Sequence, residues 1–401
     1  MQIIKGGITA PKGFLAGSIS CGIKKSGRKD LALLFSEAPC ASAGTFTVNK
    51  FRSGSVVLSE KRVKKGIAQA IIVNSGNANC CVGKKEIEDA EKITRLVGKE
   101  LRLDNALVLI ASTGIIGRPL PVEKINRNIP MLIKALSAEV VSSGFAKAIM
   151  TTDTVHKEIA VELSIGGKSI KIAGAAKGSG MICPNMATML AFFTTDALIE
   201  NPALNTALKE SVANSFNRIT VDGDMSTNDS AFVLANGMAG NRIIKKDTPD
   251  YFKFLSSIEY VAMQLAKKIV LDGEGATKFV EVLVKGADNV VNAEKIARKI
   301  AGSSLVKTMI AGGDPNWGRV AASIGSSGVN VKKDKVNIYF GGKLVMKNGK
   351  GTGISRNILG GIFKNKEIGI TVDLKSGKKT AKIWTCDLTE EYVKINAEYE
   401  T

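Results

Sequence analysis

The order of apolar and polar positions in this chain predicts strands and helices in alternation from one end to the other. Apolar residues recur at helical spacing in three long segments, residues 86–101, 204–216 and 251–271. Short apolar runs bounded by turn residues predict strands at residues 31–35, 55–58, 68–73, 106–110, 159–165, 169–173, 189–193, 279–284, 336–340, 368–372 and 380–385. Glycine pairs at 166–167 and 341–342 predict two hairpins. The pattern therefore predicts an α/β protein without internal repeats or long linkers.

The stretch of residues 177–193, Lys-Gly-Ser-Gly-Met-Ile-Cys-Pro-Asn-Met-Ala-Thr-Met-Leu-Ala-Phe-Phe, contains a candidate nucleophile. Thr188 lies where a loop rich in glycine and proline meets an apolar run that predicts a buried strand. If the Ala187–Thr188 bond were cleaved, Thr188 would carry a free α-amine beside its own hydroxyl, which is a nucleophile with a built-in base. The unperturbed pKa of an α-amine, about 7.7–8.0, suits a general base near neutral pH.

The chain has a single histidine, His156, so any Ser-His-Asp or Cys-His site would have to use it. Lys157 and Glu158 follow it directly, and this polar setting predicts a histidine on the surface. Acyl chemistry without an imidazole base is therefore favoured.

Composition indicates a globular protein, because 44% of the residues are hydrophobic and the mean hydropathy is +0.09. The length of 401 residues suits two or three modules. No apolar run reaches the roughly 18 residues that a membrane span needs, and the N-terminus lacks a signal-peptide pattern. The six cysteines form no Cys-x-x-Cys pair, so neither a zinc site nor a disulfide framework is indicated. A reducing, cytoplasmic setting is the expectation.

The net charge of +19 raises the question of nucleic-acid binding. The basic residues are scattered, aromatic content is only 5%, and no nucleic-acid-binding motif is present. A lysine-rich surface whose field attracts anionic substrates is the favoured interpretation.

Several predicted strands end in polar loops, where binding residues usually concentrate. The loop 177–180 lacks the residues of a Walker or dinucleotide phosphate loop. Segment 112–117 can present backbone N–H groups and the Thr113 hydroxyl to an anion, although a plain turn explains it as well. In segment 221–230 a calcium loop is disfavoured because Thr227 stands where glycine is required, so a polar turn or a pocket wall is expected.

Taken together, these segments resemble the ornithine acetyltransferase family, the arginine-biosynthesis enzymes also called glutamate N-acetyltransferases. The similarity covers essentially the whole chain, and the combination of motifs is specific where any single glycine loop is not. It runs through residues 7–14, 41–51, 74–79, 112–117, 150–154, 176–195, 220–230, 272–278, 312–319 and 392–401. The resemblance implies an α/β, sandwich-like fold of the ornithine acetyltransferase and DmpA-like N-terminal-nucleophile type, with mixed sheets and flanking helices.

The resemblance also implies a precursor that cleaves itself at the Ala187–Thr188 bond. The products would be an α-chain of residues 1–187 and a β-chain of residues 188–401, assembled as an α2β2 heterotetramer. Thr188 would take the acetyl group of N2-acetyl-L-ornithine and pass it to L-glutamate by ping-pong kinetics, without metal or cofactor. The sequence leaves open whether acetyl-CoA also serves as a donor.

By motif, Thr113 and Gly114 would form the oxyanion hole. The resemblance assigns substrate contacts to Thr151, Lys177, Thr188, Glu274, Asn396 and the terminal Thr401. Among the threonines of residues 151–154, Thr151 is the one assigned to the substrate contact. The charges suit amino-acid substrates, because Lys177 can pair with a carboxylate and Glu274 with an ammonium group.

Two other functions stay open at this point. An N-terminal-nucleophile amidase or aminopeptidase would share the chemistry of Thr188 but would let water deacylate the enzyme. A basic nucleic-acid-binding protein would instead bind DNA or RNA as an uncleaved chain, with strong salt dependence.

Overall fold

The computed structural model describes residues 1–138, 143–183 and 189–398. The chain forms two compact units. The first contains Met1–Asn217 and Asp224–Ile269, and the second contains Arg218–Gly223 and the described residues from Val270 to Glu398. The predicted boundary between the two processed chains, at residues 187 and 188, lies within the sequence of the first unit.

The first unit is built on one mixed nine-stranded sheet. Its strands are β1 (Gln2–Ile4), β2 (Phe14–Ile19), β3 (Leu31–Phe46), β4 (Ile67–Asn77), β5 (Val108–Ile115), β6 (Lys157–Ile165), β7 (Lys168–Lys177), β8 (Leu190–Thr195) and β9 (Ser230–Ala235). The order is β1-β6-β7-β8-β9-β3-β4-β5, and β2 pairs with β3. The pairs β4–β5 and β8–β9 are parallel, and the other pairs are antiparallel.

The long strand β3 turns this sheet into two facing layers. Its register is interrupted between Phe35 and Cys40; the earlier part pairs with β2 and β4, and the end of the strand pairs with β9. Side chains from both layers meet in one core, including Leu34, Phe192 and Phe232. The rings of Phe192 and Phe232 stack at 5.8 Å between centroids. The result is a β-sandwich.

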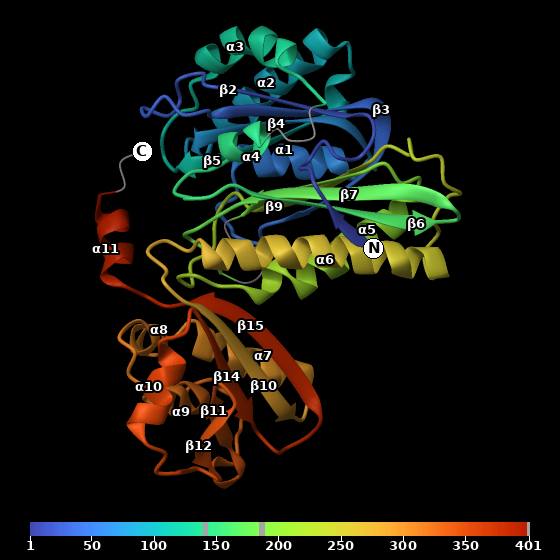
Figure 1. The fold of residues 1–401 in the computed structure, drawn as a ribbon. Helices are drawn as coiled ribbons and strands as arrows, with labels where there is room; N and C mark the ends of the chain where they lie inside the picture. The colour runs from blue at the N-terminus through green and yellow to red at the C-terminus, as the bar shows by residue number, and fades with distance from the viewer. Residues whose placement is uncertain (139–142, 184–188, 399–401) are drawn as a thin grey trace. The chain divides into compact units, whose positions relative to one another are not determined.

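Helices cover the outer faces of the sandwich (Figure 1). On the β2–β5 layer, alternate residues such as Leu31 and Leu33 pack with α1 (Gly54–Val63), α2 (Lys85–Leu101) and α3 (Val122–Lys134). The other layer carries α5 (Asn201–Asn214) and the long α6 (Pro249–Leu271), whose Val261 and Leu265 lie against Gly174 of β7. The short α4 (Gly144–Ala148) inserts Phe145 into the inner core.

The second unit has a six-stranded sheet with one buried core. Its strands are β10 (Phe279–Ala287), β11 (Asn337–Phe340), β12 (Lys343–Lys347), β13 (Lys350–Gly351), β14 (Glu367–Asp373) and β15 (Lys379–Cys386), in the order β13-β12-β11-β14-β10-β15. Its helices are α7 (Val290–Ala301), α8 (Ser304–Ala311), α9 (Trp317–Gly325), α10 (Arg356–Phe363) and α11 (Glu390–Ala397). Helices α7 to α10 contribute buried apolar residues to the core that lies on the sheet.

Three short 3-10 turns complete the described elements: η1 (Asn105–Leu107), η2 (Phe216–Arg218) and η3 (Lys333–Lys335). None of the helices in the described part of the chain is both long and apolar enough to cross a membrane.

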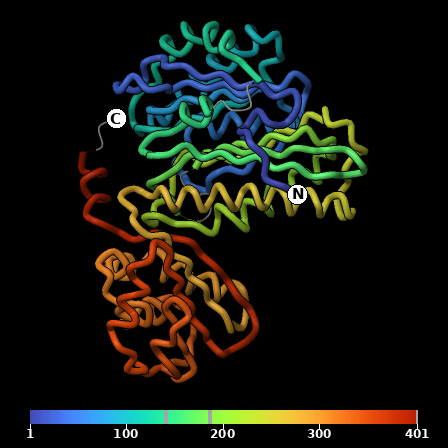
Figure 2. The backbone as a smooth tube through the Cα atoms, viewed as in Figure 1, coloured from blue at the N-terminus to red at the C-terminus, as the bar shows by residue number. Residues whose placement is uncertain are grey.

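Most predicted elements are confirmed, together with the α/β class, the mixed sheets and the sandwich-like layering. Both glycine-pair hairpins form, as β6–β7 and β11–β12, and the backbone trace follows the first of them over residues 157–177 (Figure 2). The predicted strand at residues 106–110 begins later, at Val108, and continues to Ile115.

The predicted strand at residues 55–58 is wrong, because these residues lie in helix α1. Val56 and Val57 favour a strand locally, but the Ser53 hydroxyl accepts the N–H of Val56 and caps a helix. Ser59 and Arg62 of that helix donate hydrogen bonds to the carbonyls of Ile110 and Val108 on β5. These distant contacts override the local preference.

Candidate active site

The predicted oxyanion residues, Thr113 and Gly114, lie inside strand β5 and not in a turn after it. β5 runs parallel to β4, and the register places Gly114 beside Gly76. Gly114 has a φ of +133°, and a Cβ there would lie 2.3 Å from the backbone carbon of Gly76. Glycine is therefore required at this position, both by its backbone conformation and by the close approach of the two strands.

Buried side chains hold the end of β5 in place. The Ser112 hydroxyl donates to Oδ1 of Asn74 at 2.6 Å and lies 2.7 Å from the hydroxyl of Ser55. Nδ2 of Asn228 donates to the carbonyls of Ser112, at 2.8 Å, and Ala78, at 2.6 Å. Residues 74–79, one of the segments that carry the family resemblance, are thus partly the end of β4 and partly a buried support for Thr113.

The segment that carries Asn228 also holds the start of β8. The backbone N–H of Met189 donates to Oδ1 of Asp229 at 3.0 Å, and Leu190 pairs with Ser230. Met189 follows Thr188 directly in the sequence. Ala187, Thr188 and Thr401, which were assigned to cleavage and substrate binding, lie outside the described residues.

Asp229 is a residue of this region that the sequence interpretation missed, because segment 221–230 was read as a polar turn or pocket wall. Burial raises the pKa of its carboxyl well above the usual range, although the N–H of Met189, the charge of Lys177 and the Ser226 side chain oppose the change. Its Oδ2 is buried and has no hydrogen-bond partner among the described residues. The only sequence signal was an acidic residue directly before the buried run of β9.

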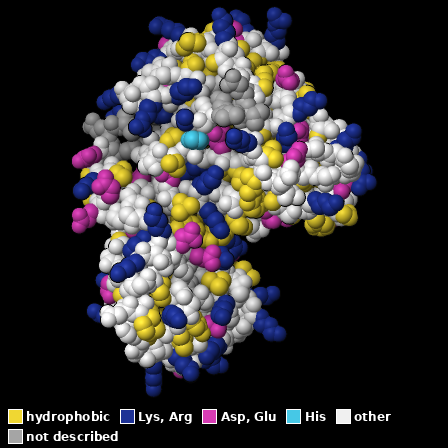
Figure 3. Space-filling view, viewed as in Figure 1, with side chains coloured by type: hydrophobic (Ala, Val, Ile, Leu, Met, Phe, Trp, Pro, Cys, Tyr) yellow, Lys and Arg dark blue, Asp and Glu magenta, His cyan; other side chains and the backbone are white. Residues whose placement is uncertain are grey.

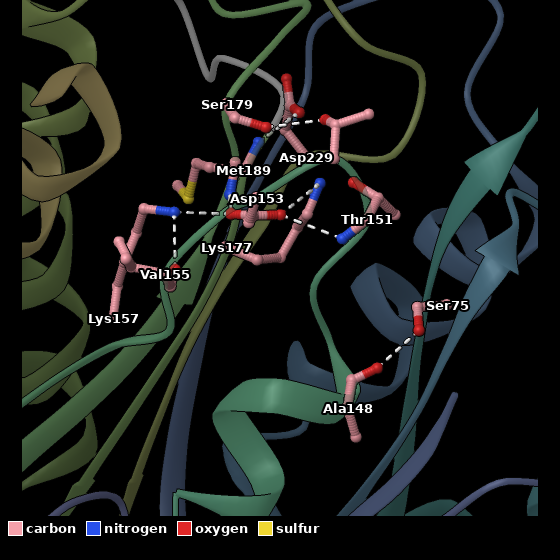
Figure 4. A network of polar contacts seen from close by, with 12 residues as sticks. Ser75, Ala148, Thr151, Asp153, Val155, Lys157, Lys177, Ser179, Met189 and Asp229 are labelled. Atoms are coloured by element: carbon pink, nitrogen blue, oxygen red, sulfur yellow. Dashed lines mark hydrogen bonds and ion pairs between the residues drawn. The ribbon is translucent and has the colours of Figure 1, made fainter. Parts of the chain in front are cut away.

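Lys177 and Thr151 meet at a second buried carboxylate, that of Asp153 (Figure 4). Oδ1 of Asp153 accepts hydrogen bonds from Nζ of Lys157 and from the N–H of Gly178, both at 2.7 Å. Oδ2 accepts the N–H of Thr151 at 3.0 Å and lies 3.9 Å from Nζ of Lys177. One aspartate therefore contacts two of the predicted substrate residues, Thr151 and Lys177.

The electrostatics of this cluster favour an ionised Asp153. Burial alone would raise the pKa of this carboxyl, but the charges of Lys177 and Lys157 and the hydrogen bonds it accepts lower it well below its usual range. Lys177 ends β7 and pairs in register with Leu190, two residues beyond Thr188. A buried cation thus lies beside β8, the strand that follows the predicted nucleophile in the sequence.

His156 is exposed, as the sequence predicts, with its Nε2 4.0 Å from Oε1 of Glu158. Burial and the charges of Lys147, Lys268 and Lys157 lower the pKa of the imidazole. Within residues 1–138, 143–183 and 189–398, no hydroxyl or thiol forms a hydrogen bond with the imidazole of the kind that a catalytic triad uses.

The other two predicted substrate residues belong to the second unit and are brought together there. Nδ2 of Asn396 in α11 donates to Oε2 of Glu274 at 2.9 Å. The Thr389 hydroxyl, at the start of α11, donates to the carbonyl of Gly275 at 2.7 Å. Gly275 has a φ of +67°, and a Cβ there would lie 2.6 Å from the backbone nitrogen of Tyr392. Glu274 lies between two glycines in the sequence, and this close packing explains the second of them.

Known proteins resemble this chain over its whole length. The ArgJ family model matches residues 15–401. The arginine biosynthesis bifunctional protein ArgJ of Caldanaerobacter subterraneus subsp. tengcongensis is 47% identical over 407 residues, covering 100% of both chains. The protein of the same name from Bacillus subtilis strain 168 is 44% identical over 403 residues, covering 100% of this chain and 98% of its own.

A solved structure agrees with these relatives. The crystal structure of the arginine biosynthesis bifunctional protein argJ from Bacillus halodurans is 43% identical to this chain, with a TM-score of 0.50. The match covers 51% of this chain and 97% of that chain. The full-length similarity and the matching motifs show that this chain belongs to the ArgJ family and is an acyltransferase of arginine biosynthesis.

Proposed function

We propose that the chain cleaves itself at Ala187–Thr188 and then transfers an acetyl group from N2-acetyl-L-ornithine to L-glutamate through an acetyl-Thr188 intermediate. The products are L-ornithine and N-acetyl-L-glutamate. The observation that carries the proposal is the match to the ArgJ family over residues 15–401, with the Ala-Thr-Met-Leu motif intact at residues 187–190.

The surroundings of Met189 support this role for Thr188. A newly formed N-terminal residue must keep its position after cleavage, although one of its covalent bonds is gone. The hydrogen bond from the N–H of Met189 to Asp229, together with the pairing of Leu190 with both Lys177 and Ser230, holds the chain immediately after the proposed cleavage point.

The proposed chemistry needs no imidazole. The free α-amine of Thr188 takes the proton of its own hydroxyl while the oxygen attacks the acetyl carbonyl carbon of N2-acetyl-L-ornithine. The backbone at Thr113 and Gly114 stabilises the oxyanion, and the amine of ornithine leaves with the proton. The amine of glutamate then attacks the acetyl ester, and Thr188 regains its hydroxyl.

The charged residues suit substrates of this class. Lys177 is buried and can pair with a carboxylate, Thr151 is held beside it by Asp153, and the Glu274–Asn396 pair can bind an ammonium group. We assign Thr401 to the same site on the family motif alone. No metal or cofactor takes part in the proposed reaction.

The proposed assembly is an α2β2 heterotetramer of residues 1–187 and 188–401, located in the cytoplasm. The solved relative is compatible with separate chains, because 97% of its length matches only 51% of this chain.

Intact-mass measurement of the purified protein beside Thr188→Ala tests the proposal. We expect two fragments, ending at Ala187 and beginning at Thr188, from the natural chain and one intact species from the variant. Acetyl transfer from N2-acetyl-L-ornithine to glutamate should be lost in Thr188→Ala. A fully active uncleaved chain, or an active Thr188→Ala variant, would overturn it.

The amidase or aminopeptidase alternative is tested in the same assay. Release of free acetate faster than formation of N-acetyl-L-glutamate, with glutamate present, would favour hydrolysis over transfer.

A further inference from the structure

A cavity of about 740 Å³ in the first unit is lined by a concentration of positive charge. Lys24, Arg28 and Lys29 line it from the loop after β2, and Lys147 lines it from α4. Residues 150–154 and His156 complete the lining. The volume falls within the range typical of pockets that bind ligands larger than a single amino acid, about 300–1,000 Å³.

Among the described residues, no ion pair joins Lys24, Arg28, Lys29 or Lys147 to a carboxylate. Lys24 donates to the carbonyl of Lys29 at 2.9 Å, and Lys29 donates to the hydroxyl of Ser18 at 3.0 Å, so both contacts are with neutral groups. Lysine and arginine side chains lie near the imidazole of His156 on this face, and an acidic side chain lies beside it as well (Figure 3).

The one acidic residue in the lining, Asp153, does not neutralise the cavity. Its two carboxylate oxygens already face Nζ of Lys157 and Nζ of Lys177, neither of which lines the cavity. The positive charge of the remaining side chains is therefore uncompensated within the lining.

The wall that carries Lys24 is a built structure. Asp30 is fully buried, and its carboxylate accepts the backbone N–H groups of Cys21 and Ile23, both at 2.6 Å, and of Lys24 at 3.0 Å. These three bonds fix the course of the loop before Arg28 and Lys29. The second wall is fixed by Asp153, which accepts the N–H of Thr151.

Two titratable groups on different walls have pKa values that are lowered first by burial and then by nearby cations. Burial and the charges of Lys177 and Arg28 lower the pKa of Lys24 to about 8, despite the opposing charges of Asp30 and Asp153. The pKa of His156 is lowered by burial and by Lys147. An anion in the cavity would relieve the repulsion at both walls.

We propose that this cavity binds a ligand carrying two or more phosphate groups, beside the amino-acid site marked by Thr151. Several cations that form no ion pair within the described residues surround one space, and they match a multiply charged anion better than a single carboxylate. Arg28 can hold two phosphate oxygens in its planar fork, and the lysines act as point charges. The position next to Thr151 as a substrate residue rests on the proposed function, whereas the anion site itself does not.

Two sources of this ligand chemistry are distinguished by experiment. The phosphates can belong to the nucleotide part of an acyl thioester donor such as acetyl-CoA, or to a free nucleotide or pyrophosphate that binds as an effector. The first source places the thioester within the amino-acid site, and the second does not.

Calorimetric titration of the processed wild-type protein with inorganic pyrophosphate, and then with ADP, tests the proposal. We expect Arg28→Gln/Lys29→Gln to raise the Kd of both at least about tenfold, because charge-assisted hydrogen bonds to phosphate are lost. Lys147→Gln, on the other wall, should raise the Kd several-fold. All three substituted side chains are exposed, so the thermal midpoint should stay within a few degrees of the wild type.

The matched control removes the same charge elsewhere. Lys50 and Lys209 are exposed and line a different cavity of about 680 Å³, where Glu60 pairs with Arg52 at 2.8 Å. Lys50→Gln/Lys209→Gln should leave the Kd unchanged. If neither pyrophosphate nor ADP binds measurably to the wild type, the proposal is overturned. It is also overturned if the control variant raises the Kd as much as Arg28→Gln/Lys29→Gln does, because the binding then depends only on net charge.

Enzyme kinetics distinguish the two possible sources of the phosphate groups. If acetyl-CoA acetylates glutamate and ADP competes with it, with a Ki equal to the Kd from calorimetry, the ligand is a donor. If ADP binds but acetyl-CoA is not used, the ligand is an effector. Transfer between N2-acetyl-L-ornithine and glutamate requires no phosphate, so failure of the proposed function would appear in that assay and leave the binding result intact.

Discussion

Nζ of Lys157 lies 2.7 Å from Oδ1 of Asp153, and both side chains are completely buried. Lys177 approaches the other oxygen of the same carboxylate at 3.9 Å. One carboxylate therefore compensates two buried ammonium groups at the end of β7, next to the strand that follows the proposed nucleophile.

Asp153→Asn should strongly destabilise the first unit. The substitution removes the carboxylate charge that two buried lysines share, and breaking a buried ion pair costs about 3–5 kcal/mol. Chemical denaturation of wild type and variant measures the difference. Asp89→Asn is the control, because Asp89 pairs with the exposed Lys92 and should change stability by less than about 1 kcal/mol.

The same carboxylate sets an acid limit on stability. Because the folded state holds the pKa of Asp153 below its unfolded value of about 3.9, its contribution is complete above that pH and is lost as the pH falls below it. The stability gap between wild type and Asp153→Asn should therefore narrow in acid. If the stability difference between the wild type and Asp153→Asn does not change with pH, the lowered pKa of Asp153 is contradicted.

Gly114→Ala should impair both stability and catalysis. The added methyl group would lie 2.3 Å from the backbone of Gly76 and would displace the backbone proposed to stabilise the oxyanion. Loss of an oxyanion donor costs about 10²–10³ in rate. The measurement is kcat for acetyl transfer, together with the thermal midpoint.

Gly117→Ala is the matched control for this prediction. Gly117 also has a positive φ, +81°, but a Cβ there meets nothing within 4 Å. It should show the modest cost of backbone strain, about 1–2 kcal/mol, without the loss of kcat. Equal kcat values in the two variants would remove Gly114 from the oxyanion hole.

Asp229→Asn should gain stability relative to the wild type as the pH rises. The folded state holds the pKa of this carboxyl above its unfolded value, so the folded protein binds more protons and wild-type stability falls with rising pH above about 4. Asparagine keeps an oxygen acceptor for the N–H of Met189 and does not titrate. Urea denaturation at about pH 5 and about pH 8 measures the change.

Asp229→Ala separates the hydrogen bond from the titration. It removes the acceptor that Met189 uses and should destabilise the protein at every pH by about 1–3 kcal/mol. If the free energy of unfolding of Asp229→Asn differs from that of the wild type by the same amount at both pH values, the carboxyl of Asp229 does not titrate in this range.

Glu274→Gln should discriminate between the two proposed substrates. The KM for N2-acetyl-L-ornithine should rise about tenfold, because its side-chain ammonium loses a charged partner. The KM for glutamate, whose side chain is a carboxylate, should stay the same or fall. Steady-state kinetics with each substrate varied in turn measures both values.

Glu391→Gln provides the control on α11. Glu391 is exposed and pairs with Lys394 at 3.7 Å, so neither KM should change. A parallel rise of both constants in Glu274→Gln would indicate a structural role, through the hydrogen bond with Asn396, and not ammonium recognition.

The sequence by itself determined the α/β class and most strands and helices, because periodicity is a local property of the chain. The resemblance to the ornithine acetyltransferase family supplied Thr113, Gly114, Lys177 and Glu274 as candidates, and their roles stay predictions. Thr188 stays a prediction that rests on its motif. The helix at residues 54–63 was missed because its stabilising partners, Val108 and Ile110, lie about fifty residues away.

Tertiary structure alone decided which polar groups share a buried space. Asp153 could be recognised as the partner of two lysines only after β6 and β7 paired, and Asp229 as the support of Met189 only after β8 and β9 paired. The cationic cavity likewise joins the loop after β2 to α4 and residues 150–154. Burial and proximity set the charge and the free energy of such groups, and both depend on segments that are distant in the chain.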